Sequence, residues 1–403
     1  MSSRLLIRNA RVLDVVAGDY LVGTSVLVED GRIREIRPAL TAPGAETIDA
    51  ADRVVMPGLI DAHVHPMISS LHIGSLADLP LTLLAQRARV ALEAMARRGY
   101  TTVRDACGGD RGLVRATQEG LIKGPRLFVS GRALSQTGGH GDSRRPGDLC
   151  AGHTDQFSRV VDGVDAVRRA AREELRAGAH QLKIMASGGV ASPSDEIWTL
   201  QYSVQEMRAA VEEAEARRSY VLAHAYTAEA VTRAVHAGVR SIEHGNLIDV
   251  AAADLMAAAG TFLVPTLVTY EKLHAHGDEL GMPADQLRKV VDVIDAGLDS
   301  LAIARTAGVK VGFGTDLLGD LQVHQNDEFR IRGGAQDPID TIRSATVVNA
   351  ELLGLDGLAG VVAQDAYADL LIVDGDPLTD AAALTDPSTI ALVMREGTVL
   401  HAA

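Results

Sequence analysis

The sequence is poor in cysteine and in aromatic residues. Only Cys107 and Cys150 occur among 403 residues, which excludes a disulfide scaffold and is typical of a reducing compartment. Aromatic residues make up 3% of the chain, whereas hydrophobic residues of all kinds make up 47%. We therefore expect an aliphatic core, and such a core suits parallel strands that are buried on both faces.

Long hydrophobic runs are also missing. The first apolar run is Leu5, Leu6 and Ile7, with an arginine on either side, so we predict no signal-peptide core. No uncharged stretch reaches the roughly 20 residues that span a bilayer. We expect a cytoplasmic protein without a membrane partner.

Positive charge is in deficit. The chain carries 39 Lys and Arg residues against 53 Asp and Glu residues, a formal net charge of -14. Nucleic acids and anionic membranes both require a basic surface, so neither is an expected partner. A small-molecule substrate is the expected partner instead.

The chain is longer than one hydrophobic core usually serves, which is about 250–300 residues. Both of its ends consist of short alternating apolar and polar runs with turn residues between them, a pattern typical of β-strands. We predict one small composite β-sandwich domain formed by residues 1–56 and 361–403. Residues 57–360 would form a catalytic domain.

The middle of the chain alternates short apolar runs with amphipathic stretches of helical periodicity. Strands are predicted at 58–61, 102–105, 127–130, 181–185, 220–223, 240–243, 261–264 and 310–313. Helices are predicted between them, at 81–98, 160–177, 204–217 and 285–307. This order predicts an α/β fold with a parallel (β/α)8 TIM barrel, whose active site lies at the C-terminal ends of the strands. The long glycine-rich loop at 131–158 is expected at that face.

Candidate metal ligands stand at the predicted strand ends. His63 and His65 follow the first strand, and residues i and i+2 of a strand face the same side, so both imidazoles can converge on one ion. His224, His244 and Asp316 end three later strands. Imidazole and carboxylate groups are the ligand set of zinc or a similar first-row divalent metal.

Lys183 lies inside the apolar run at 181–185. A buried ammonium group beside divalent cations is strongly disfavoured. Either the side chain turns outward, or carbon dioxide carbamylates it to an anion with two oxygens that can bridge two metals. The residues alone leave both alternatives open.

These motifs resemble the amidohydrolase superfamily, in its imidazolonepropionase-like branch. The matching segments are PGLIDAHVH at 57–65, KIMASGG at 183–189, HAYT at 224–227, SIEHG at 241–245, GTD at 314–316 and, near the C-terminus, DGDP at 374–377. The resemblance implies two divalent metal ions per chain, for which we expect zinc, and a homo-oligomeric assembly. The implied ligands are His63, His65 and Asp316 for one ion, His224 and His244 for the other, and carboxylated Lys183 as the bridge.

The resemblance also implies a reaction. Asp316 would orient a metal-activated water, accept its proton and pass the proton to the leaving nitrogen of an amide. QTGGHGD at 136–142 and HAY at 224–226 are similar to members that cleave dipeptides and N-acyl amino acids, such as Xaa-Pro dipeptidases and ochratoxin-hydrolysing enzymes. In those terms His140 would contact the scissile carbonyl and Tyr226 the substrate carboxylate. Opening of a cyclic amide, or hydrolysis of a lactone or organophosphate ester, is the alternative.

Other residues near these motifs have less defined roles. Arg144 and Arg145 either meet a substrate carboxylate or stay solvated, and residues 265–270 are expected to line one wall of the site. His72 matches no ligand position, and no motif makes Cys107 a nucleophile. The sequence does not fix the preferred substrate side chains or choose among zinc, manganese, cobalt and iron.

Overall fold

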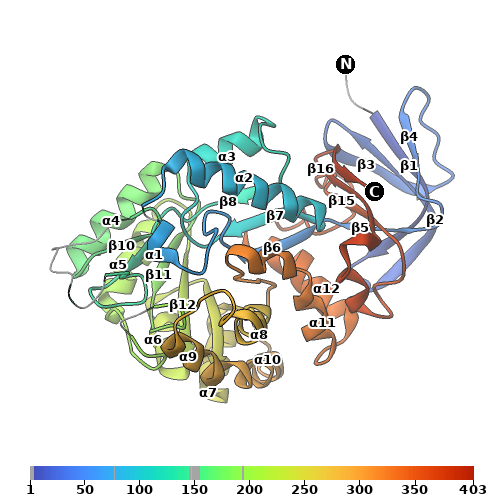
Figure 1. The fold of residues 1–403 in the computed structure, drawn as a ribbon. Helices are drawn as coiled ribbons and strands as arrows, with labels where there is room; N and C mark the ends of the chain where they lie inside the picture. Colours follow the sequence, from blue (N-terminus) through green and yellow to red (C-terminus); the bar gives the residue numbers. More distant parts are fainter. Residues whose placement is uncertain (1–3, 77, 145–146, 148–154, 193–194) are drawn as a thin grey trace.

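The computed structural model describes residues 4–76, 78–144, 147, 155–192 and 195–403. Strands from both ends of the chain form one eight-stranded sheet, in the order β17-β16-β15-β5-β1-β2-β3 with β4 paired to β1. We call it the terminal sheet, and Figure 1 shows it beside the barrel. Its strands are β1 (Arg4–Asp14), β2 (Asp19–Glu29), β3 (Arg32–Pro38), β4 (Glu46–Asp49), β5 (Val54–Pro57), β15 (Leu370–Val373), β16 (Ile390–Arg395) and β17 (Thr398–Ala402).

The two ends of the chain meet where β5 pairs with β15. The pairing is antiparallel and places Leu371 opposite Met56. Apolar side chains on one face of the sheet, including Ile7, Val26 and Ile372, form a buried cluster. The alternating pattern at each end of the sequence therefore leads to one shared core, because each end buries its apolar face against the other.

The barrel is built from parallel strands. They form one sheet in the order β6-β7-β8 and another in the order β10-β9-β11-β12-β13-β14. Their bounds are β6 (Leu59–Val64), β7 (Tyr100–Asp105), β8 (Arg126–Phe128), β9 (Ala133–Ser135), β10 (Ser158–Val160), β11 (Leu182–Met185), β12 (Val221–Thr227), β13 (Ser241–Leu247) and β14 (Phe262–Val264). The predicted α/β fold with a TIM barrel is confirmed.

Two barrel strands differ from the prediction. The third is divided into β8, which pairs with β7, and β9, which pairs with β11. The eighth, expected at 310–313, forms only an isolated parallel bridge between Val311 and Leu263. At Phe313 the Asn349 side chain makes bonds of the kind that a strand partner makes: its Oδ1 accepts from Phe313 N at 3.1 Å, and its Nδ2 donates to Phe313 O at 2.7 Å.

Helices surround the barrel strands (Figure 1). They are α1 (Ile73–Leu76), α2 (Leu81–Arg97), α3 (Arg111–Gln118), α4 (Val164–Ala177), α5 (Val204–Glu215), α6 (Ala228–Ala237), α7 (Val250–Ala259), α8 (Leu267–His276), α9 (Ala284–Ile294), α10 (Ala296–Thr306), α11 (Asp327–Gly333), α12 (Pro338–Arg343) and α13 (Asn349–Leu352). The single helix expected at 285–307 is thus two helices, α9 and α10. Among the residues that the structure describes, no helix combines the length and hydrophobicity that crossing a membrane requires.

Local sequence signals explain several helix limits. Ser203 and Glu206 form a reciprocal capping box at the start of α5. Gly238 ends α6 with φ of 95°, a left-handed conformation that glycine adopts without a Cβ penalty. These limits bring the chain back to the next strand, so that each strand ends at the same face of the barrel.

Candidate active site

A cavity of about 520 Å³ opens at the C-terminal ends of the barrel strands, a region that we call the barrel mouth. All eight residues proposed from the sequence as ligands or substrate contacts line it: His63, His65, His140, Lys183, His224, Tyr226, His244 and Asp316. Thr269 and Tyr270 also line it, as expected for the segment 265–270. His72, which matched no ligand position, is exposed and lies on the cavity wall as well.

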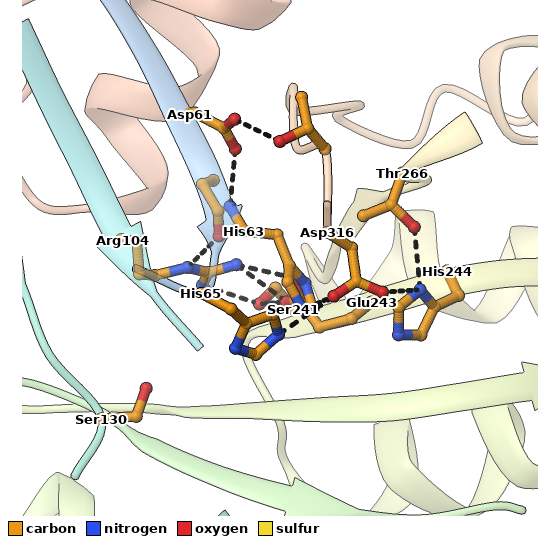
Figure 2. Close-up of polar contacts among 12 residues, drawn as sticks. Asp61, His63, His65, Arg104, Ser130, Ser241, Glu243, His244, Thr266 and Asp316 are labelled. Carbon is orange, nitrogen blue, oxygen red and sulfur yellow. Dashed lines mark hydrogen bonds and ion pairs between the residues drawn. The ribbon is translucent and has the colours of Figure 1, made fainter. Parts of the chain in front are cut away.

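Asp316 lies among three histidines. Its Oδ1 is 3.3 Å from His63 Nε2 and 3.0 Å from His65 Nε2, and its Oδ2 is 3.9 Å from His244 Nδ1. Figure 2 shows this carboxylate between His65 and His244. Ligand atoms of His63, His244 and Asp316 all lie within 4.8 Å of one another, so this group could hold a metal ion.

Backbone strain accompanies these side chains. His244 has φ of 77° and Asp316 has φ of 52°, although neither is glycine. Thr266, whose Oγ1 lies 2.8 Å from His244 Nδ1, has φ of 47°. Such left-handed residues cost free energy and persist only where the surrounding structure holds them, and they are concentrated at functional sites.

His63 is oriented by a buried ion pair. Glu243 Oε2 accepts a hydrogen bond from His63 Nδ1 at 2.7 Å, and Arg104 Nη2 donates to both oxygens of Glu243 at 2.8 and 3.0 Å. Because Nδ1 carries the proton, Nε2 is left with a lone pair toward the cavity. Figure 2 shows Arg104 and Glu243 beside His63. Sequence reasoning gave neither residue a role, although an arginine and a glutamate inside apolar strands are signals of a buried pair.

Lys183 is buried on β11 and lines the cavity. The alternative in which its side chain turns outward is therefore wrong. Within the described part of the chain, no hydrogen bond or ion pair is formed by its amino group. Burial lowers the pKa of Lys183, which favours the neutral amine that reacts with carbon dioxide.

Burial also sets the charge of the second pair of predicted ligands. It lowers the pKa of His224 and of His244 well below the usual value, so both imidazoles are neutral at neutral pH. Burial by itself would raise the pKa of Asp316, but the neighbouring His63 and His65 lower it well below its usual range. His224 and His244 therefore present neutral nitrogen donors, and Asp316 is an ionised carboxylate.

His140 stacks on His224, with ring centroids 4.2 Å apart and an interplanar angle of 16°. Its Nδ1 is shut off from solvent and has no hydrogen-bond partner among the described residues. Gly189 makes room for the ring, because a Cβ at that position would lie 2.3 Å from His140 Cε1. His140 itself lines the cavity.

Two tyrosines border His244. Tyr270 Oη lies 2.9 Å from His244 Nδ1 and donates to Tyr226 Oη at 2.9 Å. The ring of Tyr226 stacks on His244 at a centroid distance of 5.2 Å. The Tyr226 hydroxyl thus accepts from Tyr270 and keeps its own proton to donate.

Cys107 is buried and lies on the cavity wall, with Sγ 3.4 Å from His65 Nδ1. Burial by itself would lower the pKa of His65, but Cys107 and Asp316 raise it well above the usual value. Cys107 therefore lies next to His65, a predicted metal ligand. The sequence pattern did not indicate this contact.

Arg144 and Arg145, in the long loop, were candidates for contact with a substrate carboxylate. Arg144 Nε donates to Asp142 Oδ1 at 2.8 Å, so its guanidinium is paired within the loop. Arg145 lies outside the described residues. The choice between a substrate contact and a solvated pair therefore stays a prediction for Arg145.

Known proteins resemble this chain along most of its length. The sequence profile described as "Amidohydrolase family" matches residues 54–400. Ochratoxinase from Aspergillus niger is 32% identical over 366 residues, which cover 85% of this chain and 75% of that protein.

Solved structures share the fold as well. A prolidase complexed with N-methylphosphonate-L-proline is 48% identical over 100% of both chains, with a TM-score of 0.98. A Xaa-Pro dipeptidase with bound methionine in the active site is 29% identical over 100% of both chains, with a TM-score of 0.88.

Proposed function

Because this chain belongs to the amidohydrolase family, we propose that it is a binuclear metal-dependent hydrolase of dipeptides or N-acyl amino acids. The observation that carries the proposal is the convergence of the predicted ligands on one cavity, with the Lys183 amine unpaired among the described residues. Relatives named as a prolidase, a Xaa-Pro dipeptidase and an ochratoxinase support an amide as the bond that is cleaved.

The donor set fits two divalent ions. His63, His65 and Asp316 would hold one, His224 and His244 the other, and carboxylated Lys183 would bridge them. His63 is preset for this role by Glu243, and the low pKa values of His224 and His244 leave their lone pairs free. When bound, such ions polarise a carbonyl and lower the pKa of water toward neutrality.

Side chains of the protein itself would transfer the proton and orient the substrate. The ionised carboxylate of Asp316 accepts a proton from the attacking water and returns it to the leaving nitrogen. His140, which lines the cavity beside His224, would hydrogen-bond the oxygen of the scissile carbonyl. Tyr226, with its hydroxyl proton free, would donate to the substrate carboxylate.

The test is the release of free amino acid from a panel of dipeptides and N-acyl amino acids by enzyme of measured metal content. The panel should span proline, aromatic, aliphatic and basic residues at the carboxyl end. Cleavage that a chelator abolishes supports the proposal. No cleavage by enzyme that carries two metals per chain would remove the peptide assignment and direct the search to cyclic amides and lactones.

Two variants separate the parts of the proposal. Lys183→Ala should bind the metal pair more weakly and lose any dependence of metal loading on bicarbonate. If it binds two metals as tightly as the parent, the bridging carbamate is excluded. Tyr226→Phe should raise KM for carboxylate substrates, and an unchanged KM would remove this residue from recognition.

The identity of the metal and the oligomeric state can each be tested directly. Zinc is the metal that we expect, and elemental analysis of the purified protein tests it. A homo-oligomer is the expected state, which light scattering tests.

A further inference from the structure

A buried lysine on α9 lies under the loop that follows β11. Lys289 Nζ donates to the carbonyl oxygens of Gly189 at 3.3 Å and Ser192 at 2.9 Å, and also to that of Asp195. Its side chain is 3% exposed, and the carboxylate of Asp195 lies 3.9 Å away. An ammonium group has three donors, so these three carbonyls satisfy it completely.

The contacts continue from Asp195 to the active site. Asp195 Oδ2 accepts from Gln201 Nε2 at 2.6 Å, and Gln201 Oε1 accepts from the backbone N–H of His140 at 2.9 Å. A chain of hydrogen bonds therefore runs from Lys289 on α9 to the backbone of His140.

The same loop touches a predicted metal ligand. The carbonyl oxygen of Gly188 lies 3.1 Å from His224 Nε2. A carbonyl oxygen only accepts, so Nε2 must carry the proton and Nδ1 of His224 keeps its lone pair. Gly189 is held beside it, with the ring of His140 in the space where its Cβ would lie.

We propose that Lys289 is a positioning residue, which holds residues 188–192 and 195–201 so that His140 and the tautomer of His224 are fixed together. His140 and His224 stack on each other, so a shift of the loop would move both. The inference rests on the proposed function only for the roles of these two histidines in catalysis. The hydrogen bonds that carry it belong to the chain itself.

The neighbouring residue on α9 offers a matched control. Arg288 Nη2 pairs with Glu196 Oε2 at 2.8 Å, but the two side chains are 51% and 41% exposed. Arg288 therefore contacts the same loop from the same helix, but at the surface. An ion pair that is exposed to solvent contributes little to stability.

The experiment compares Lys289→Met with Arg288→Met in the full chain loaded with zinc. We expect kcat/KM of Lys289→Met to fall about 10- to 100-fold, the usual effect of removing a group that orients a ligand. The loss should lie mainly in kcat, because His140 would hydrogen-bond the reacting carbonyl and His224 would hold one of the metal ions. Arg288→Met should stay within about threefold of the parent.

A second readout does not depend on activity. In metal-free protein labelled with ¹⁵N-histidine, NMR should show the protonated Nε2 of His224 in the parent and in Arg288→Met. Lys289→Met should lose this single tautomer. If the parent cleaves none of the peptides, the proposed function fails, while the histidine spectra still test the positioning role of Lys289.

Gln201→Met keeps the inference testable if Lys289→Met does not fold. It breaks the path between Asp195 and His140 and leaves the contacts of Lys289 in place, so kcat should fall while His224 keeps its tautomer. Unchanged kcat in Gln201→Met would overturn the connection to His140. A folded Lys289→Met variant with the parent's kcat and the parent's His224 spectrum would overturn the inference as a whole.

Discussion

An ion pair on the terminal sheet lies in solvent, whereas one behind the barrel mouth is buried. Arg8 and Asp49 on the sheet are 53% and 44% exposed, and Arg104 and Glu243 behind His63 are both 0% exposed. Exposed pairs contribute about 0–1 kcal/mol to stability. A buried pair costs desolvation, so its presence at the mouth indicates a role in positioning His63.

The two regions also use left-handed backbone differently. In the terminal sheet, Asp30 and Glu396 have positive φ and each precedes a glycine in a turn between strands. At the mouth, positive φ occurs at His244 and Asp316, whose side chains face the cavity. Left-handed residues in the terminal sheet therefore allow tight turns, whereas those at the barrel mouth direct side chains into the cavity.

Metal removal should produce the largest difference between the two regions. A chelator should abolish hydrolysis and lower the Tm, since an ion present at 100 to 1,000 times its Kd stabilises the native state by about 3–4 kcal/mol. Hydrogen exchange should accelerate at the ends of β12 and β13 and stay unchanged in β1 and β2. Full activity in protein shown to be metal-free would contradict the metal mechanism.

Asp316→Asn should have the next largest effect, which is a loss of kcat. Asparagine tolerates the left-handed backbone at this position, so the fold should persist while the proton acceptor is lost. We expect kcat to fall about 10²- to 10⁴-fold in steady-state assays of amino-acid release. Asp49→Asn makes the same change in the terminal sheet and should leave kcat as it is. If Asp316→Asn and Asp49→Asn lost equal amounts of kcat, Asp316 would have no specific role in the reaction.

Breaking the buried ion pair should mainly affect stability. Arg104→Met leaves Glu243 charged and buried with its main partner gone, so the free energy of unfolding should fall by about 3–5 kcal/mol. Arg8→Met should cost less than about 1 kcal/mol. Urea titration of both variants measures the difference, and similar midpoints would show that burial does not separate the two regions.

The pH dependence should have opposite signs in the two regions. Burial raises the pKa of Asp105, at the end of β7, to about 7, above its value in the unfolded chain. The folded state therefore binds an extra proton between about pH 4 and 7, and this carboxyl lowers stability as the pH rises through that window. Asp105→Asn should flatten the stability curve there, which thermal melts across pH can detect.

Asp49 provides the contrast. Hydrogen bonds from Asn9 lower the pKa of Asp49, so its contribution is present above the unfolded pKa and is lost as the pH falls through the folded one. Asp49→Asn should therefore change stability only slightly, and only above about pH 4. A larger change than that of Asp105→Asn would reverse the comparison.

Much of the architecture was predictable because strand and helix periods are local. The apolar runs placed seven barrel strands within a few residues of their observed positions, and His63-Val64-His65 predicted two rings on one side of the first strand. The eighth strand was not predictable in its irregular form, since the Asn349 side chain that bonds to the Phe313 backbone comes from α13. The domain boundaries and the metal-binding roles stay predictions.

The sequence by itself determined the order of strands and helices and which side chains stand at strand ends, because hydrophobic periodicity and turn chemistry act over a few residues. Only the tertiary structure decided that Lys183 faces the cavity, that Glu243 and Arg104 orient His63, and that Lys289 lies under residues 188–192. These contacts join residues 97 to 180 positions apart. Burying a charge is favourable only where several distant groups pair with it at once, and that condition exists only after the barrel has closed.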